Sequence, residues 1–521
     1  MENVKSDESK VKVSRKFRDT LMAIYVVMIC VGLPLIFHNQ YFDILIIKYY
    51  YYCFCTITML ILLISSNVFY LKNSGQTFKN ALKQILRGLT WADYSVICFY
   101  AVATLSTLTS DYIYESFWGN EGRLTGLFLI TWYVLSYFCI SRFWKFSIKY
   151  IDVLLIAGIL VCLFGISDYF KLDILKFKIN MVDNQRDIFT STIGNINTYT
   201  AYVGIIVSIS AVLFAMERKL LKSVFYFFTM VISYFAIIMG ASDNAYLSIG
   251  ALFALLPLYL FRNSDGIKKY FIILATFATV VQAIGVINHY LADQVIGIDS
   301  TFKLLIEIKA FVLIPIVLWL IVALWYLVDL YKKRANIKYN NKLCYLWFAI
   351  LITMFFTIIF MLYDCNIAGH TMRYGILSNY LVFNDDWGTH RGYIWRNAIE
   401  CYFDLSWWKK AVGYGPETFG ILMLKKTAEN PYNEIFDSAH NEYLHLLTTV
   451  GIFGLISYLS FILGIIINGV KKHINKPYIV AVLFSVVCYC VQAFVNLNIP
   501  IIAPIFWVLL SISSAKSLET E

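Results

Sequence analysis

The stretch "SAHNEYLHLLTTVGIFG", residues 438–454, joins a short polar cluster to the start of a long apolar run. The run covers residues 444–468, and a helix of that length can cross a hydrocarbon layer about 30 Å thick. A lipid-facing strand would leave backbone N–H and C=O groups unpaired, so we expect the run to be helical. The stretch therefore predicts a transmembrane helix that begins beside a histidine, His440.

Similar runs recur along the whole chain of 521 residues, of which 60% are apolar and 17% aromatic. This composition excludes an ordinary soluble enzyme. We expect an all-α polytopic membrane protein with about fourteen transmembrane helices, in a range of about twelve to fourteen. The weakest signals are the third, the eighth and the last of the predicted runs. These lie at residues 20–38, 50–71, 94–109, 124–141, 150–168, 198–215, 224–240, 245–261, 270–289, 308–329, 344–363, 444–468, 478–495 and 499–514.

The positions of Lys and Arg predict the orientation, because short basic loops stay in the cytoplasm. Every second connection is basic, which predicts that both termini are cytoplasmic. The net charge of +10 then reflects topology and contact with anionic membrane lipids, and it does not argue for nucleic acid. The basic residues of the predicted cytoplasmic side are Lys5, Lys10, Lys12, Arg15, Lys16, Arg18, Lys72, Lys79, Lys83, Arg87, Arg142, Lys145, Lys149, Arg218, Lys219, Lys222, Arg262, Lys268, Lys269, Lys332, Lys333, Arg334, Lys338, Lys342, Lys471, Lys472, Lys476 and Lys516.

The predicted outward loop of residues 364–439 is too long and too rich in Trp and Tyr to be a simple connector. Within residues 391–420 of this loop we expect an amphipathic helix with Ile394, Trp395, Ile399 and Phe403 on one face, ended by the turn 413–416. The predicted organisation is a cytoplasmic leader (1–19), a transmembrane bundle of about eleven helices (20–363), the large extracytoplasmic loop (364–439), C-terminal transmembrane helices (440–514) and a cytoplasmic tail (515–521).

Polar clusters at residues 119–126, 189–200, 240–244 and 438–441 fall on the same outer side, which suggests a site at that membrane face. If the helix that follows His440 is continuous, rotation by about 100° per residue puts His440, Gly451 and Gly454 on one face. The two glycines would then allow close helix packing, and His445 would point elsewhere. A simpler alternative is that His440 and Asn441 only cap the helix.

The pattern His440-Asn441, nine residues, then Gly451-x-x-Gly454 resembles the signature of the O-antigen ligase and O-antigen polymerase superfamily. The resemblance extends over about residues 110–470. Its supporting elements follow in the same chain order: Arg123 with Gly126, Gly194-Asn195-x-Asn197, Arg391-x-x-x-Trp395, and Gly413-x-Gly415-Pro416.

The resemblance implies a bacterial plasma-membrane or inner-membrane glycosyltransferase of GT-C-like architecture with an extracytoplasmic active site. Such enzymes take a glycan from an undecaprenyl diphosphate carrier, which is a substrate, and need neither a metal nor another cofactor. The implied partners are a polyprenyl diphosphate-linked oligosaccharide donor, a polysaccharide or lipid acceptor, membrane lipids and potential polysaccharide-assembly proteins. The family's long outer loop contributes to the site, which matches the position of residues 364–439.

Roles for the matching residues follow from the reaction. A sugar hydroxyl that attacks an anomeric carbon needs a base, and we assign that role to His440. The departing lipid diphosphate gains negative charge, which favours guanidinium partners: Arg391 first, then Arg123, then Arg396. Residues expected to hold sugar hydroxyls or orient the histidine are Asn441, Asn195 and Asn197, and the expected structural glycines are Gly451, Gly454, Gly413 and Gly415.

Each assignment has a structural alternative. Arg391 could snorkel to lipid headgroups, and Arg123 and Arg396 could be solvated or lipid-facing. Asn195 and Asn197 could be ordinary helix caps.

One departure from the family pattern bears on the reaction. Ligases of this family commonly carry a Ser-Arg pair where this chain has Ser242-Asp243. The departure favours a polysaccharide polymerase over a ligase, and Asp243 is expected to order a sugar or pair with Arg391.

Other classes of protein remain as alternatives. A lipid-linked oligosaccharide flippase would also suit many spans, but transporters usually carry ionisable residues near the bilayer midplane, and these runs have almost none. A non-catalytic scaffold or receptor is a further alternative. Cys365 and Cys401 both lie in the outer loop, where a disulfide between them is one alternative. No cysteine or histidine spacing typical of a metal site occurs.

Overall fold

The computed structural model describes residues 2–74, 88–120, 122–145, 147–298, 312–334 and 342–515, together with positions 77, 79, 80, 83 and 303. Over these ranges the chain is helical except for loops and one short antiparallel pair, β1 (Phe189–Thr190) with β2 (Gly194–Asn195). The predicted all-α polytopic membrane fold is confirmed. Of the residues used to predict orientation, Arg87, Lys338 and Lys516 lie outside the described residues, as do residues 516–521 of the predicted tail.

The first half of the chain contains α1 (Glu2–Val27), η1 (Met28–Gly32), α2 (Leu33–Leu35), α3 (Ile44–Ser74), α5 (Trp91–Leu108), α6 (Ile113–Trp118), α7 (Leu127–Phe143), α8 (Ile148–Tyr169), α9 (Asp183–Arg186), α10 (Ile196–Met216), α11 (Leu220–Met239) and α12 (Asn244–Leu260). Local chemistry sets several of the boundaries. A capping box of Thr90 and Asp93 begins α5, and the side chain of Asn195 accepts a hydrogen bond at the start of α10.

The second half contains α13 (Ser264–Tyr290), η2 (Ala292–Gln294), α15 (Leu313–Arg334), α16 (Lys342–Asn366), η4 (Thr371–Leu377), α17 (Ser378–Leu381), α18 (Trp387–Asp404), α19 (Trp407–Val412), α20 (Phe419–Thr427), α21 (Glu442–Thr449), α22 (Gly451–His473), α23 (Pro477–Gln492), η5 (Ala493–Val495) and α24 (Ala503–Ser513). Pro477 and Pro504 stand in the first turns of α23 and α24, where the missing N–H has no helical partner to lose.

Over the described residues, each predicted apolar run corresponds to a helix of this structure, and residues 308–311 of the tenth run lie outside them. Among the described residues, ten helices are long and apolar enough to cross a membrane, and α7, α12 and α24 are shorter apolar helices. The third run corresponds to α5, which belongs to neither group. The number of helices that cross the bilayer stays a prediction.

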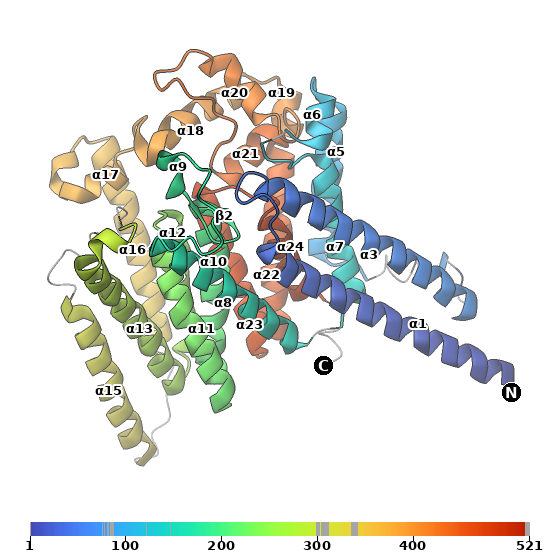
Figure 1. The fold of residues 1–521 in the computed structure, drawn as a ribbon, viewed down its shortest axis with the longest axis horizontal. Coiled ribbons are helices and arrows are strands. Elements are labelled where there is room, and N and C mark those ends of the chain that lie inside the picture. The colour runs from blue at the N-terminus through green and yellow to red at the C-terminus, as the bar shows by residue number, and fades with distance from the viewer. Residues whose placement is uncertain are drawn as a thin grey trace.

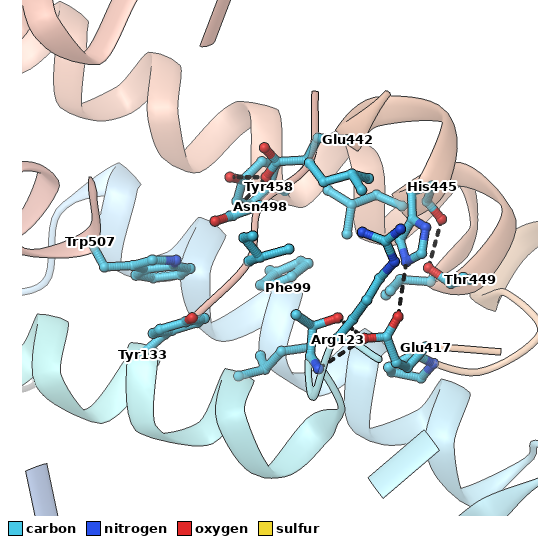
Figure 2. A pocket seen from close by; sticks show the side chains of 17 residues that line it. Phe99, Arg123, Tyr133, Glu417, Glu442, His445, Thr449, Tyr458, Asn498 and Trp507 are labelled. Carbon is cyan, nitrogen blue, oxygen red and sulfur yellow. Dashed lines mark hydrogen bonds and ion pairs between the residues drawn. The ribbon is translucent and has the colours of Figure 1, made fainter. Parts of the chain in front are cut away.

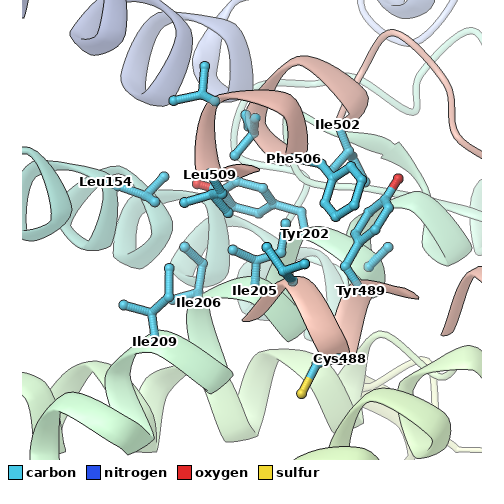
Figure 3. Packing of buried hydrophobic residues seen from close by; sticks show 14 of the residues in the cluster. Leu154, Tyr202, Ile205, Ile206, Ile209, Cys488, Tyr489, Ile502, Phe506 and Leu509 are labelled. Carbon is cyan, nitrogen blue, oxygen red and sulfur yellow. The ribbon is translucent and has the colours of Figure 1, made fainter. Parts of the chain in front are cut away.

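Helix α10 lies at the centre of the bundle. Its most apolar window is 94% buried, whereas the corresponding window of α16 is 0% buried, so α16 lies at the periphery. Figure 3 shows Tyr202, Ile205 and Ile206 of α10 packed among side chains of α8, α23 and α24. Lipid tails are as apolar as these side chains, so close packing, more than removal from water, holds such helices together.

Residues 371–441 form a second layer at one end of the bundle, where Figure 1 shows α18, α19 and α20 above the helix ends. The layer has its own apolar core, which includes Ile394, Phe419 and Met423. The predicted helix is present as α18, but its apolar face differs, because Ile399 and Phe403 are exposed. The glycine-rich turn 413–416 ends the short helix α19 and not α18.

The predicted continuous helix after His440 is wrong. The chain forms α21 and then α22, with Val450 between them and Gly451 in a left-handed conformation at φ +76°. The cause is a second segment that approaches this break. The backbone N–H groups of Tyr414 and Gly415 donate to the carbonyl oxygens of Thr448 and Thr449 at 3.1 and 2.9 Å. We call this contact the glycine junction.

Both glycines at the junction exclude a side chain. A Cβ on Gly413 would lie 2.2 Å from the Thr449 carbonyl oxygen, and one on Gly451 would lie 2.4 Å from the Ala411 carbonyl oxygen. The predicted structural role therefore holds for Gly413 and Gly451. The reason is that two backbone segments approach each other closely at these glycines, and not that two helix faces pack together. A Cβ on Gly415 would meet Ser116 Oγ at 2.2 Å, and one on Gly454 would meet Val450 Cγ1 at 2.4 Å.

Gly451→Ala should destabilise the protein by about 2 to 5 kcal/mol, because it adds a left-handed alanine and a clash with backbone. The measurement is the midpoint of thermal unfolding of the purified protein in detergent. Gly250→Ala is the matched control, because Gly250 lies inside α12 and an added Cβ meets nothing within 4 Å. Equal midpoints for Gly451→Ala and the wild type would contradict the described junction.

Candidate active site

His440 lies immediately before α21, half-buried, with a left-handed backbone at φ +44°. The cap of α21 is provided by its neighbour: Asn441 Oδ1 accepts hydrogen bonds from the backbone N–H groups of Tyr443 and Leu444 at 3.0 and 3.1 Å. The capping alternative therefore accounts for Asn441. It does not account for His440, whose imidazole is left for another role.

Three charged side chains act on His440: Arg123, Arg391 and Asp437. Arg123 Nη2 donates to Asp437 Oδ1 at 2.8 Å, which links the loop before α7 to the segment before His440. Burial, and after it the positive charges of Arg123 and Arg391, lower the pKa of His440 to about 4, while Asp437 acts in the opposite direction. The imidazole is therefore neutral at neutral pH. The structure thus brings together His440, Arg391 and Arg123.

Arg391 follows three consecutive residues with left-handed backbone, Gly388, Thr389 and His390. Such a conformation is costly for a β-branched residue. The ring of His390 stacks on Tyr432 with centroids 3.7 Å apart, which helps to hold the turn. Arg391 is half-buried, and burial lowers the pKa of its guanidinium, while Asp243 raises it. Its Nε has no hydrogen-bond partner among the described residues, so this donor is available to a ligand.

A second polar centre is formed by Glu417 and His445, both labelled in Figure 2, together with Thr125, and His440 acts electrostatically on its histidine. The carboxylate of Glu417 is fully buried, accepts a hydrogen bond from Thr125 N at 2.8 Å and another from the Thr125 hydroxyl, and lies 3.9 Å from His445 Nε2. Burial raises the pKa of Glu417 and lowers that of His445 to about 3. The prediction that His445 points elsewhere is wrong: His440 acts electrostatically on His445, because His440 has a left-handed backbone before α21 and is not part of the assumed continuous helix.

A cavity begins at this second centre and continues between α5, α7, α22 and α24 (Figure 2). About 80 Å³ of it is open to a molecule the size of water. One wall carries Glu442, whose Oε1 accepts hydrogen bonds from Tyr458 Oη at 2.6 Å and Asn498 Nδ2 at 3.0 Å. Burial raises the pKa of Glu442 to about 7.

The other predicted polar residues have structural roles that the contacts define. Asn195 Oδ1 accepts a hydrogen bond from Asn197 N at 2.9 Å and so caps α10. The Asn197 carbonyl oxygen accepts from Asn244 Nδ2 at 2.8 Å and Asn496 Nδ2 at 3.1 Å, and its side chain accepts from Ser242. Their role in glycan binding stays a prediction.

Asp243 and Arg396 have the more exposed positions. Asp243 is exposed and faces Arg391 closely enough to act on its charge. Arg396 forms an ion pair with Asp385 at 2.8 Å and stacks on Tyr393, and none of these contacts involves the group around His440. Its assignment to the donor diphosphate stays a prediction, in third place.

Two further predictions concern sulfur and metals. Cys365 and Cys401 are both free and buried, so the alternative of a disulfide between them is not present. Across the described ranges, no three His, Cys, Asp or Glu side chains lie close enough together to hold a metal ion.

Sequence reasoning missed Asp437, Glu417, Thr125 and Glu442. Each stands next to a motif that was recognised: Asp437 three residues before His440, Glu417 directly after Pro416, Thr125 two residues after Arg123 and Glu442 directly after Asn441. A polar residue at the edge of a glycine-rich turn was the available signal. The spacing of these residues in the sequence could not show that the segments that carry them contact each other in the fold.

The comparisons with known proteins agree with the sequence pattern. No curated protein matches the chain. Residues 310–459 match the family model described as O-Antigen ligase, and this range contains Arg391, Glu417, Asp437, His440 and His445, whereas Arg123 lies outside it. The match supports the resemblance to the O-antigen ligase and O-antigen polymerase superfamily, and residues 310–459 of this membrane protein are similar to the O-Antigen ligase model.

Proposed function

We propose that this protein is a metal-independent glycosyltransferase that extends a surface polysaccharide from an undecaprenyl diphosphate-linked donor at the outer face of the bacterial plasma membrane. The observation that carries the proposal is the neutral imidazole of His440 in the field of two guanidinium groups, at one end of a helical bundle. The family match supports the class of reaction.

The geometry suits the two demands of glycosyl transfer. The neutral imidazole of His440 accepts the proton of the acceptor hydroxyl while its oxygen bonds to the anomeric carbon of the donor. The bond between that carbon and the diphosphate breaks, and the electron pair leaves with the lipid diphosphate. Each arginine has an Nε without a partner among the described residues, but Arg123 already donates its Nη2 to Asp437, so Arg391 is the stronger candidate to bind this anion.

Asp243 supports a polymerase over a ligase that attaches the glycan to a lipid or protein. It stands where ligases of the family commonly carry an arginine, and it faces Arg391. A carboxylate there adds no attraction for the diphosphate, but it can accept hydrogen bonds from sugar hydroxyls. Lengthening of the repeat indicates a polymerase, and transfer only to a lipid or protein indicates a ligase.

His440→Ala should reduce chain extension by about 10²- to 10⁴-fold, because the base is lost. Arg391→Gln should reduce it by about 10²-fold or more, because charge on the departing diphosphate is no longer compensated. The assay gives the purified protein a lipid diphosphate-linked repeat and separates the products by length. His289→Ala and Arg373→Gln alter exposed side chains elsewhere and serve as matched controls.

Two results would contradict this proposal. Full extension activity in His440→Ala, at an unchanged thermal midpoint, would remove the base from the mechanism. Movement of intact donor across vesicles by the wild type, with no new glycosidic bond, would favour a flippase.

The pH dependence follows from the lowered pKa of His440. Because only the neutral imidazole accepts a proton, kcat/KM should stay high as the pH falls below the usual histidine range and should decrease around pH 4. In Arg391→Gln one of the positive charges that lower the pKa is absent, so the decrease should begin at a higher pH. Arg373→Gln should leave the profile unchanged. A decrease near the ordinary histidine pKa in both wild type and Arg391→Gln would contradict the assignment.

The orientation can be tested with single cysteines at two strongly exposed positions, Met372 beside α17 and Leu221 at the start of α11, which are 95% and 84% exposed. We expect a membrane-impermeant maleimide to label Met372→Cys in intact cells. Leu221→Cys lies among basic residues of the predicted cytoplasmic side and should react only after permeabilisation. The background chain carries Cys98→Ser, because Cys98 is exposed. The opposite labelling pattern would move the site to the cytoplasm.

A further inference from the structure

The cavity beside the second polar centre is lined by aromatic and polar side chains. Its floor contains four aromatic side chains, from Phe99 of α5, Tyr133 of α7, Tyr458 of α22 and Trp507 of α24. Tyr133 and Trp507 stack at a centroid distance of 5.4 Å and lie at the end of the cavity away from Glu417 and His445 (Figure 2). Both belong to the second turn of their helices, so the cavity descends below the helix ends that meet the α18–α20 layer.

Five residues that line this cavity each carry a buried polar atom that has no hydrogen-bond partner within the described part of the chain. Native proteins pair nearly all buried polar atoms, so such a group marks a place for a polar ligand or ordered water. Two of the five atoms belong to residues at the aromatic end of the cavity, and the other three belong to residues at its polar end. The atoms are Tyr133 Oη, Trp507 Nε1, Glu417 Oε1, His445 Nδ1 and Arg123 Nε.

The chemistry of the lining fits a sugar ring. Trp507 donates only, a carboxylate accepts only, and the tyrosine hydroxyl does both. A hydroxylated ring offers donors and acceptors on its edge and apolar C–H groups on its faces, which aromatic walls accommodate. The open volume of about 80 Å³ would hold roughly five to eight water molecules. That is room for one ring and not for a longer segment.

The charged groups of the lining indicate which of the two sugar-bearing substrates, the donor or the acceptor, the cavity binds. The cavity is lined by the carboxyl groups of Glu417 and Glu442, and its one guanidinium, Arg123, is already paired with Asp437. The first sugar of the donor is bonded to a diphosphate, and the described lining offers that anion no guanidinium or ammonium group that is not already ion-paired. The growing end of the acceptor glycan carries no phosphate, so the cavity suits the acceptor.

We propose that the cavity between α5, α7, α22 and α24 binds the terminal sugar ring of the acceptor glycan, with Trp507 and Tyr133 as specificity-determining residues. The inference rests on the proposed function, since it assigns one substrate of that reaction to one part of the site. Arg123 connects the two parts, because it lines the cavity and also pairs with Asp437, which acts on His440.

The test measures binding without catalysis. The probe is the repeat-unit oligosaccharide released by mild acid from the cell's own lipid-linked donor, titrated calorimetrically into the full-length protein in detergent. Tyr133→Phe removes one hydroxyl at constant shape, and Trp507→Phe removes the indole N–H. We expect each to raise the Kd for the oligosaccharide by about fivefold to tenfold, as for the loss of one hydrogen bond, and to leave KM for the lipid-linked donor unchanged when the oligosaccharide is supplied as a saturating acceptor.

Matched controls make the same deletions at atoms outside the cavity. Tyr202 and Trp132 also carry buried polar atoms without a partner among the described residues, and neither lines the cavity. Tyr202→Phe and Trp132→Phe should therefore bind the oligosaccharide as the wild type does. A comparable weakening in the controls would show a general packing effect and overturn the inference.

Other results separate the inference from the proposed function. Unchanged oligosaccharide binding in Tyr133→Phe and Trp507→Phe, with an active wild type, overturns the inference and leaves the proposed function intact. A raised KM for the donor instead of a raised Kd for the oligosaccharide assigns the cavity to the donor sugar and overturns the acceptor assignment. A wild type that forms no new glycosidic bond overturns the proposed function itself.

Discussion

The candidate site depends on the glycine junction, where the turn after α19 pairs with the end of α21. The Thr449 carbonyl oxygen accepts hydrogen bonds from Gly415 N and from Ser106 Oγ of α5, each at 2.9 Å, and Ser110 Oγ donates to the Tyr414 carbonyl oxygen at 2.8 Å. The carbonyl of a broken helix end thus receives donors from two other segments, as buried backbone requires. This contact ends α21 and fixes where Glu417 and His445 face each other.

Several residues of the candidate site have unfavourable backbone conformations. His440 and Glu417 have left-handed backbone, and Arg391 follows three left-handed residues. Local sequence preference would not choose these conformations, and the surrounding contacts impose them. The result is a basic side chain and an imidazole held half-buried near each other, where lowered solvent screening strengthens their mutual effect.

The helices and the meeting of His440 with Arg391 and Arg123 could be predicted from sequence, because apolar length and an ordered set of motifs carry that information. The break between α21 and α22 could not. A glycine in an apolar run is compatible with close helix packing and with a left-handed turn, and spacing alone does not distinguish them. Assuming one continuous helix, the sequence put His445 on the wrong side. Glu417 and Asp437 stand beside recognised motifs, but their meeting with Thr125 and Arg123 depends on tertiary structure.

The distribution of charge around His440 indicates where the donor and the acceptor bind. Arg391 has an unpaired donor on one side of His440, and the cavity beyond Arg123 is lined by carboxyl groups and aromatic rings. An anionic leaving group is stabilised by Arg391, whereas in the cavity the guanidinium of Arg123 is already paired with Asp437. A neutral sugar ring has the opposite preference, because it can satisfy the unpaired donors and acceptors of the cavity. His440 is in electrostatic contact with Arg391 and with Arg123, which lines the cavity. A base in that position deprotonates an acceptor hydroxyl where it can meet a donor sugar bound through its diphosphate.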